Sequence, residues 1–321
     1  MHYFKLALST VAGVALAASA SAQTVGIGST KAGAVAQITA TMSKVVSSHA
    51  DGIQMRSQTM GGTQQYIPVV NAGELDFGIS NIPQYSMAYN GTGLSEGNKY
   101  DNLRLVTTMM LFRVAFITPA KMDLKSAADL KGHPMPYGFK ASPLFAAISA
   151  GVLATEGLTY NDVTQVPIVG LVQSWRAVME GKVDGAIAAL GSGFIKQMNA
   201  TISGGVKFIS VKEGPEALAA LHKHFPKSYF TTVQPSKAYT GVVGPTTFVT
   251  YDYSLWTHKG LSDEVVYKVT KVMHQNAAEL KEGGPLWNSY KADANMAKDQ
   301  GFPYHPGALK YYKEAGLLPK G

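Results

Sequence analysis

Residues 70–80 read VNAGELDFGIS and residues 179–188 read MEGKVDGAIA, and the two stretches follow one pattern. Each predicts a helix that ends at a glycine, a polar turn with an aspartate, and then a short buried strand. Two such units in one chain predict two similar α/β lobes, and lobes of this kind hold ligands between them. The matched positions are Gly73 with Gly181, Asp76 with Asp184, and Ile79 with Ile187.

The sequence around these units alternates between expected strands and helices. Strands are expected at 25–28, 53–58 and 76–80, with amphipathic helices between them, and a strand-rich stretch follows at 103–118. A second run of strands and helices begins at Ser126. This alternation predicts an α/β fold in which each lobe is a mainly parallel sheet flanked by helices.

The order of these segments predicts that the chain crosses between the lobes twice. We expect lobe I to comprise residues 23–113 and 240–321, and lobe II residues 114–239. Near the end, Ser262 is expected to cap a long helix that continues to the glycine pair after residue 282. This helix-rich tail is expected to pack back on lobe I.

Residues 1–22 have the pattern of a secretory signal peptide. Lys5 precedes an apolar, alanine-rich run at 6–18, and the small residues Ala20 and Ala22 flank a cleavage site before Gln23. An uncleaved anchor is the alternative. The chain has no cysteine, so disulfides and a lipid-modified cysteine are excluded. We therefore expect a soluble periplasmic protein without a lipid anchor.

The composition argues for a folded protein that does not bind nucleic acid. Hydrophobic residues make up 46% and charged residues 15%, and the net charge is +7 without runs of lysine or arginine. Phosphate tracking along nucleic acids needs clustered positive charge. A weakly basic chain is compatible with a small anionic ligand, and we expect a monomer.

The strongest local motif is GIGSTKAG at 26–33, where a strand is expected to meet a helix. Backbone N–H groups at a helix start, with hydroxyls beside them, bind anions. The dinucleotide pattern G-x-G-x-x-G fails at Lys31, and the phosphate loop fails because Ala34 and Val35 follow Gly33. We therefore expect a carboxylate or phosphate site here, with an ordinary tight turn as the alternative.

Similar polar loops follow the other expected strands. They are MGGTQ at 60–64 and SNIPQY at 80–85 in the first lobe, and GFKAS at 138–142 and LGSG at 190–193 in the second. Ligands of open parallel sheets bind beyond the carboxyl ends of the strands. The loops are therefore expected to converge on one site.

Motifs for catalysis or for a metal ion are weak. There is no cysteine nucleophile, no G-x-S-x-G and no H-E-x-x-H. His222 and His224 lie two residues apart and do not share a helix face. We therefore expect no enzyme activity, no metal and no cofactor. An exported hydrolase or isomerase that uses Ser29 or Ser142 is the alternative in which the chain is an enzyme.

Five segments of the chain are informative when taken together. They are GIGSTKAG (26–33), MGGTQQYI (60–67), GISNIPQYSMAYNG (78–91), LKSAADLKGHPMPYG (124–138) and YHPGALKYYKEAGLLP (304–319). Over nearly all of the chain after residue 22, they resemble the TAXI family of TRAP-transporter substrate-binding proteins. The resemblance implies a two-lobed type II periplasmic binding protein fold with the ligand cleft between the lobes. It also implies delivery of a small organic anion to a membrane permease driven by an ion gradient.

The resemblance also implies which residues touch the ligand. The chain departs from the family at Lys31, where a small residue is usual, and at 139–143, where the family usually has a P-G-S-G-T turn. We hypothesise that Lys31 or Lys140 neutralises a carboxylate while neighbouring hydroxyl and amide groups orient it. An alternative with the same fold is the binding protein of an ATP-driven importer for a pyrimidine precursor or a sulfonate. The implied contacts are Ser29, Thr30, Gly62, Thr63, Asn81, Tyr85, Ser142, Gly191 and Ser192.

Overall fold

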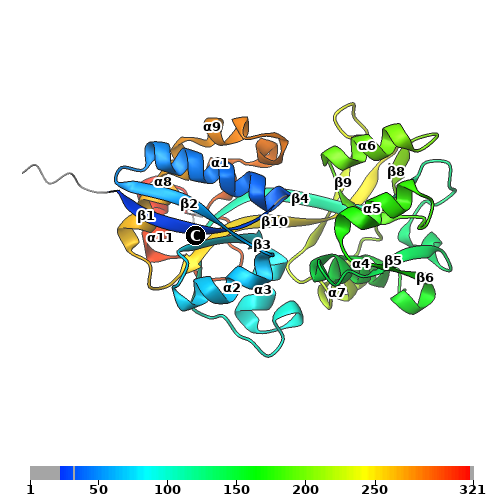
Figure 1. Cartoon of the computed structure of the whole chain (residues 1–321), viewed down its shortest axis with the longest axis horizontal. Coiled ribbons are helices and arrows are strands. Elements are labelled where there is room, and N and C mark those ends of the chain that lie inside the picture. The colour runs from blue at the N-terminus through cyan, green and yellow to red at the C-terminus, as the bar shows by residue number, and fades with distance from the viewer. Residues whose placement is uncertain (1–21, 32, 319–321) are drawn as a thin grey trace, which may run out of the picture.

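The computed structural model describes residues 22–31 and 33–318, so the expected signal peptide lies outside it except for Ala22. Figure 1 shows two groups of helices and strands side by side, joined by two long strands. These are β4 (Leu103–Pro119) and β10 (Thr246–His258), which pair with each other antiparallel. Within the described residues, no helix is both long and apolar enough to cross a membrane.

The first lobe is built from both ends of the chain. Its sheet has the order β2-β1-β3-β10-β4, with β1, β2 and β3 parallel and β10 antiparallel to β3. Helices α1 and α8 pack together on one face, and α2 and α3 cover the other (Figure 1). Its further elements are β1 (Gln23–Thr30), α1 (Ala34–His49), β2 (Ile53–Met60), α2 (Thr63–Ala72), β3 (Phe77–Asn81), α3 (Ile82–Asn90), η1 (Gly93–Ser95), α8 (Asp263–Gln275), α9 (Ala277–Glu282), η4 (Pro285–Ser289), α10 (Ala292–Asn295) and α11 (Pro306–Glu314).

The second lobe lies between the two long strands in the sequence. The parallel pair β5–β6 forms a separate small sheet, and β7, β8 and β9 pair antiparallel with the far ends of β4 and β10. The expectation of a mainly parallel sheet therefore fits lobe I better than lobe II. Its elements are η2 (Ala127–Leu130), β5 (Pro134–Gly138), α4 (Pro143–Thr155), η3 (Tyr160–Asp162), β6 (Thr164–Ile168), α5 (Leu171–Met179), β7 (Ala186–Ala189), α6 (Gly193–Thr201), β8 (Val206–Phe208), α7 (Pro215–His222) and β9 (Tyr229–Val233).

The expected boundaries of the lobes can be placed on these elements. The boundary between 113 and 114 falls inside β4, and the one between 239 and 240 falls in the connection from β9 to β10. Both long strands therefore contribute residues to both lobes.

The repeated helix-turn-strand unit is confirmed. Gly73 follows α2 and Gly181 follows α5, with φ of 81° and 69°, a left-handed conformation that glycine adopts without strain. The carboxylate of Asp76 accepts a hydrogen bond of 2.7 Å from the backbone N–H of Gly26 in β1. In the second lobe, the matched Asp184 carboxylate lies 2.7 Å from His133 Nδ1, just before β5.

Two details of the helices differ from the prediction. Thr63 is the first residue of α2, not its N-cap; Gly62 takes that place, and the Thr63 hydroxyl bonds to Tyr66 instead. The long helix after Ser262 does not run on to the glycine pair. It breaks at Asn276 into α8 and α9, and the Asn276 side chain donates to the carbonyl of Val272 in the last turn of α8.

Candidate functional site

Three loops of the first lobe lie at one edge of its sheet. The parallel pairing of β1 with β2 places Thr30 opposite Met60, and Ile27 lies opposite Phe77 of β3. Counted on along β1 and β3, this register brings Lys31 level with Asn81. In Figure 1, β1 runs toward the second lobe, so its carboxyl end and those of its neighbours face that lobe. The structure therefore brings these three expected ligand loops together.

The side chains of these loops differ in how free they are. Ser29 is 3% exposed, and its hydroxyl lies 2.7 Å from the Thr39 hydroxyl. Thr63 Oγ1 lies 3.1 Å from the Tyr66 hydroxyl, and Asn81 caps α3 by accepting from the backbone N–H of Gln84. Both of these groups, and Ser29, already have partners that a ligand would have to share or replace.

The remaining expected contacts of this lobe are Thr30, Lys31 and Gly62, which can offer a ligand a side chain that is half-buried, a charged side chain and an open backbone. Thr30 is half-buried, and Lys31 is exposed next to it. Gly62 carries no side chain, and nothing lies within 4 Å of the place where a Cβ would stand. The second loop is therefore open at Gly62, and the first loop carries an exposed cation at Lys31.

Tyr85 does not lie at this edge as a free contact. Its side chain is fully buried between Tyr89, Trp256 and Phe302, with ring centroids 5.2–6.1 Å apart. Its hydroxyl has no hydrogen-bond partner within the described residues, and burial raises its pKa far above the ordinary value. Sequence reasoning placed Tyr85 at the ligand because of its amphipathic character, but α3 turns this ring into the core, where it is closed off from a ligand by its aromatic neighbours.

Two loops of the second lobe lie against each other. Gly138 pairs with Ile168 at the ends of β5 and β6, and the N–H of Ala141 donates to the carbonyl of Val169 at 2.8 Å. Ser142 is the N-cap of α4, and its side chain makes no capping hydrogen bond. Lys140 next to it is exposed. A hydroxyl and a cation are thus available at this helix start.

The third loop of the second lobe is tied to the crossing strand. The N–H of Leu190 donates to the carbonyl of Arg113 in β4 at 2.8 Å. Gly191 follows with φ of 86°, and Ser192 is the N-cap of α6. The Ser192 hydroxyl is buried and has no partner in the part of the chain that the structure describes.

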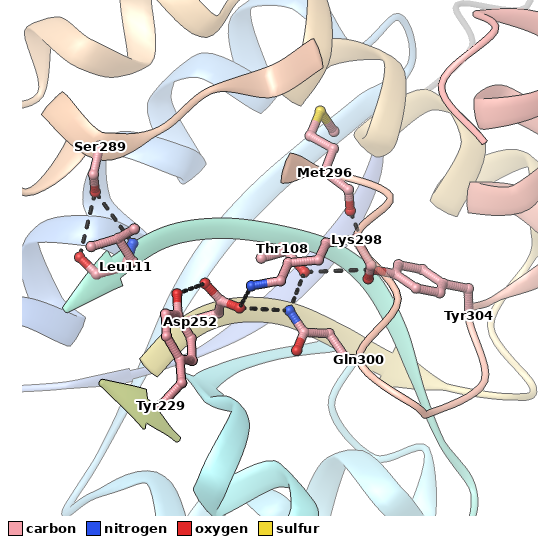
Figure 2. Close-up of polar contacts among 9 residues, drawn as sticks. All are labelled: Thr108, Leu111, Tyr229, Asp252, Ser289, Met296, Lys298, Gln300 and Tyr304. Carbon is pink, nitrogen blue, oxygen red and sulfur yellow. Dashed lines mark hydrogen bonds and ion pairs between the residues drawn. The ribbon is translucent and has the colours of Figure 1, made fainter. Parts of the chain in front are cut away.

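A polar network holds the crossing strands on one face, as Figure 2 shows. Asp252 in β10 is 7% exposed, and its carboxylate lies 2.5 Å from Lys298 Nζ. It also accepts from Gln300 at 2.9 Å and from the hydroxyl of Tyr229 in β9 at 3.2 Å. Asp252 is therefore bonded to groups from both lobes, because Tyr229 in β9 belongs to the second lobe while Lys298 and Gln300 in the C-terminal segment belong to the first.

An aromatic group lies where β4 and β10 cross. Phe112 stacks on Tyr251 with ring centroids 5.9 Å apart, and Tyr253 lies 5.3 Å from Phe112. Sequence reasoning missed these residues and Asp252, because a strand of buried residues gives no sign of which side chains face a site. The signal available was the TYDYS stretch at 250–254, which places a charge among aromatic residues.

Other features of the described residues lie elsewhere. A pocket of about 810 Å³ lies between the end of α1 and α8, away from the six loops. A second of about 420 Å³ surrounds Asp252 and Lys298. Within residues 22–31 and 33–318, no group of three or more histidine or acidic side chains is placed to hold a metal ion.

Comparisons with known proteins agree on the fold. The sulfonate-binding protein SsuA from Methylobacillus flagellatus KT is 16% identical, with a TM-score of 0.53 over 92% of this chain and 96% of its own. A TctC solute binding protein from Polaromonas is 13% identical, with a TM-score of 0.57 over 92% and 96%. PhnD1 from Prochlorococcus marinus, solved with methylphosphonate, is 10% identical, with a TM-score of 0.56 over 92% and 99%.

The fold is therefore that of the periplasmic solute-binding proteins. Residues 20–316 match the model of the NMT1-like family, and the chain belongs to this family. None of the three similar structures is named as an enzyme.

Proposed function

We propose that this protein is a periplasmic solute-binding protein that captures a small organic anion between its two lobes and delivers it to an ion-gradient-driven TRAP permease. The observation that carries the proposal is the placement of polar loops at strand ends in both lobes, on either side of the crossing strands β4 and β10. Loops at the carboxyl ends of strands are where open α/β sheets bind ligands. The motif resemblance to the TAXI family supports the TRAP permease as partner.

The proposed contacts divide by chemistry. Lys31 from one lobe and Lys140 from the other are exposed cations that can approach one anionic group. Thr63, Asn81 and Ser142 supply hydroxyl and amide groups that fix its orientation. Charge-assisted hydrogen bonds of this kind contribute about 1.5–3 kcal/mol each when shielded from water. Thr30, Gly62, Gly191 and Ser192 complete the proposed contact set.

Closure of the two lobes follows from this arrangement. We propose residues 23–113 with 240–321 as one rigid lobe and 114–239 as the other, with motion where β4 and β10 cross. A ligand favours the closed form only if it binds that form better. A ligand that bridges Lys31 and Lys140 meets this condition, and the permease would then recognise the closed shape.

A second candidate partner is an ATP-driven importer for a sulfonate or a related anion. It is favoured by two of the similar solved structures, one named for a sulfonate transporter and one solved with methylphosphonate. Sulfonates and phosphonates are tetrahedral anions that helix starts and lysines also bind.

Thermal unfolding against a panel of carboxylates, amino acids, sulfonates and phosphonates tests the proposal. A ligand at 100 times its dissociation constant adds about 2.7 kcal/mol, which raises the midpoint by about 5 °C for a chain of this length. No shift with any anion, on protein stripped of ligand by refolding, would contradict it, and turnover of a bound compound would indicate an exported hydrolase or isomerase. Uptake into membrane vesicles that depends on ATP, and not on an ion gradient, would select the second partner.

A further inference from the structure

The aromatic group at the crossing strands extends from the second lobe to one ligand loop of the first lobe. Phe112 of β4 lies directly opposite Tyr251 of β10, and the two rings are nearly parallel, at 5°. Phe225, which follows α7 in the second lobe, meets Tyr251 edge-on with ring centroids 5.2 Å apart. Tyr253, two residues along β10, lies opposite Asn81 of the first lobe. The rings thus reach from the segment after α7 in the second lobe to a first-lobe ligand loop.

The two tyrosine hydroxyls of this group have no hydrogen-bond partner among the residues that the structure describes. Tyr251 is 5% and Tyr253 is 8% exposed. Neither hydroxyl has a hydrogen-bond partner within the described residues. Neither oxygen is completely buried, because the fully buried oxygen atoms without a partner are those of other residues. The small exposed part of each side chain therefore includes its hydroxyl. Buried tyrosines usually find a partner for this group, so a pair of free hydroxyls needs an explanation.

Tyr253 also lies near the loops of the first lobe, because it pairs with Asn81 and acts on Tyr66. The Tyr66 hydroxyl lies 3.1 Å from Thr63 and donates to the carbonyl of Ile79. Burial raises the pKa of Tyr66 well above its ordinary value, and the neighbouring Tyr253 adds to this rise. Burial likewise raises the pKa of Tyr251, again with a contribution from Tyr253. All three phenols therefore stay protonated and remain neutral hydrogen-bond donors.

A hydrogen-bond network on the opposite face of β10 fixes the part of the strand that carries the two tyrosines. Side chains alternate along a strand, so Asp252 points away from Tyr251 and Tyr253. Figure 2 shows Asp252 bound to Lys298, Gln300 and Tyr229 on that face. The network fixes the strand between the two tyrosines without using either of them.

We propose that Phe112, Tyr251 and Tyr253 form the inner wall of the solute site, and that the solute is a planar organic acid with an uncharged oxygen opposite its carboxylate. This inference rests on the proposed function and names the class of anion for that same site. The flat rings give contact area to a planar body, and the two phenols donate to its uncharged oxygen. The carboxylate then points outward to the lysines of the loops.

The test compares four acids by titration calorimetry: 4-hydroxybenzoate, benzoate, acetate and methanesulfonate. We expect 4-hydroxybenzoate to bind at least about tenfold more tightly than acetate or methanesulfonate, because only it fills the wall and pairs with the phenols. Tyr251→Phe and Tyr253→Phe keep the rings and remove the hydroxyls. Each should weaken 4-hydroxybenzoate roughly fivefold to tenfold and leave benzoate within about twofold.

The control and the contrary outcomes separate this inference from the proposed function. Tyr267→Phe removes a hydroxyl on the far side of lobe I, bound to Glu314, and should change no affinity. If acetate or methanesulfonate binds wild-type protein at least as tightly as the planar acids, or if the two variants bind all four acids as wild type does, the inference is wrong while solute binding stands. If none of the four acids binds, the inference is wrong, and the wider thermal panel of carboxylates, amino acids, sulfonates and phosphonates decides the proposed function. The ranking of the acids on wild-type protein decides the matter even if a variant does not fold.

Discussion

Tyr66 and Trp175 make corresponding hydrogen bonds in the two lobes, from positions one residue apart in the repeat. The Tyr66 hydroxyl in α2 donates to the carbonyl of Ile79 at 2.5 Å, and Trp175 Nε1 in α5 donates to the carbonyl of Ile187 at 2.8 Å. The two isoleucines are matched positions of the sequence repeat. The repeat therefore includes a side-chain hydrogen bond from the helix to the strand that follows it, although the donor is a different residue in each lobe.

Loss of either donor should destabilise the protein. Tyr66→Phe leaves a buried carbonyl with one partner fewer, and we expect the free energy of unfolding to fall by about 1–2 kcal/mol. Trp175→Phe also loses side-chain volume and should cost about 2–3 kcal/mol. Urea unfolding measures both, with Tyr137→Phe at an exposed ring as control. Equal stability of Tyr66→Phe and wild type would show that the bond at Ile79 contributes nothing.

Gly78 should not tolerate a side chain. It lies in β3 opposite Trp256, and a Cβ at Gly78 would approach the indole ring to less than 3 Å. The ring is fully buried and cannot move aside, so Gly78→Ala should cost about 1–3 kcal/mol or prevent folding. Gly244→Ala is the matched control, because nothing lies within 4 Å of its Cβ position. Similar melting temperatures for the two variants would contradict this reading of the sheet.

Removal of the Asp252 carboxylate should weaken the crossing strands. Asp252→Ala leaves Lys298, Gln300 and Tyr229 without their shared acceptor, and we expect a loss of about 2–3 kcal/mol by urea unfolding. Lys298→Met should cost less, because the lysine side chain is 41% exposed and water already screens the pair. Asp123→Asn removes an exposed aspartate whose ion pair with Lys125 is also exposed, and it should have no effect. A loss for Lys298→Met larger than that for Asp252→Ala would refute the account.

Stability should fall in mild acid because of His305. This side chain caps α11, and burial lowers its pKa from the ordinary 6.5, outweighing the opposite effect of Asp263. As the pH falls, the unfolded chain therefore takes up a proton at His305 before the folded chain does. The contribution of neutral His305 to the free energy of unfolding is complete above about pH 6.5 and is lost as the pH falls below that value. His258 and His224 have pKa values lowered by burial and act in the same direction.

The His305→Asn variant isolates this effect. Asparagine keeps an acceptor for the helix start but does not titrate, so the variant should lose less stability than wild type between pH 7.5 and pH 5.5. Urea midpoints at the two pH values measure the difference. Identical losses in both proteins would assign the pH dependence to other groups.

Lys31 and Lys140 should contribute to the affinity for anions and not to the stability of the fold. With the acid that gives the largest thermal shift in the panel, Lys31→Gln with Lys140→Gln should lower affinity at least about tenfold, since each charge-assisted bond contributes about 1.5–3 kcal/mol. The melting temperature without ligand should not change, because both side chains are exposed. Lys313→Gln on α11 removes the same charge elsewhere and should leave affinity intact. Unchanged affinity in the double variant would remove both lysines from the site.

The sequence predicts helices and their ends well where a single physical rule determines the local structure. The apolar stripe of Val265, Val266, Val269, Val272 and Met273 predicts the buried face of α8, because a period of 3.6 residues permits no other amphipathic structure. Gly73 and Gly181 predict helix ends, because a left-handed residue is needed there. The same reasoning predicts that tail helices pack on lobe I, and α8 does so against α1.

Other features depend on tertiary structure that no local pattern contains. Thr63 has the composition of an N-cap, but Tyr66 offers its hydroxyl a partner and Gly62 takes the cap. The antiparallel partners of β4 and β10 in the second lobe follow from strand pairing over long separations. Tyr85 and Tyr253 have the same chemistry, yet packing buries the Tyr85 hydroxyl completely among aromatic rings and leaves the Tyr253 side chain slightly exposed.

Because β4 and β10 contribute residues to both lobes, they determine the order in which the two lobes can fold during synthesis. The second lobe consists of one continuous stretch and has most of its partners once β9 has emerged. The first lobe must wait: β3 lacks its neighbour until β10 arrives, and α1 lacks the cover of α8. The N-terminal third of the chain therefore spends the longest time with exposed apolar surface, and this is where a chaperone would be needed most.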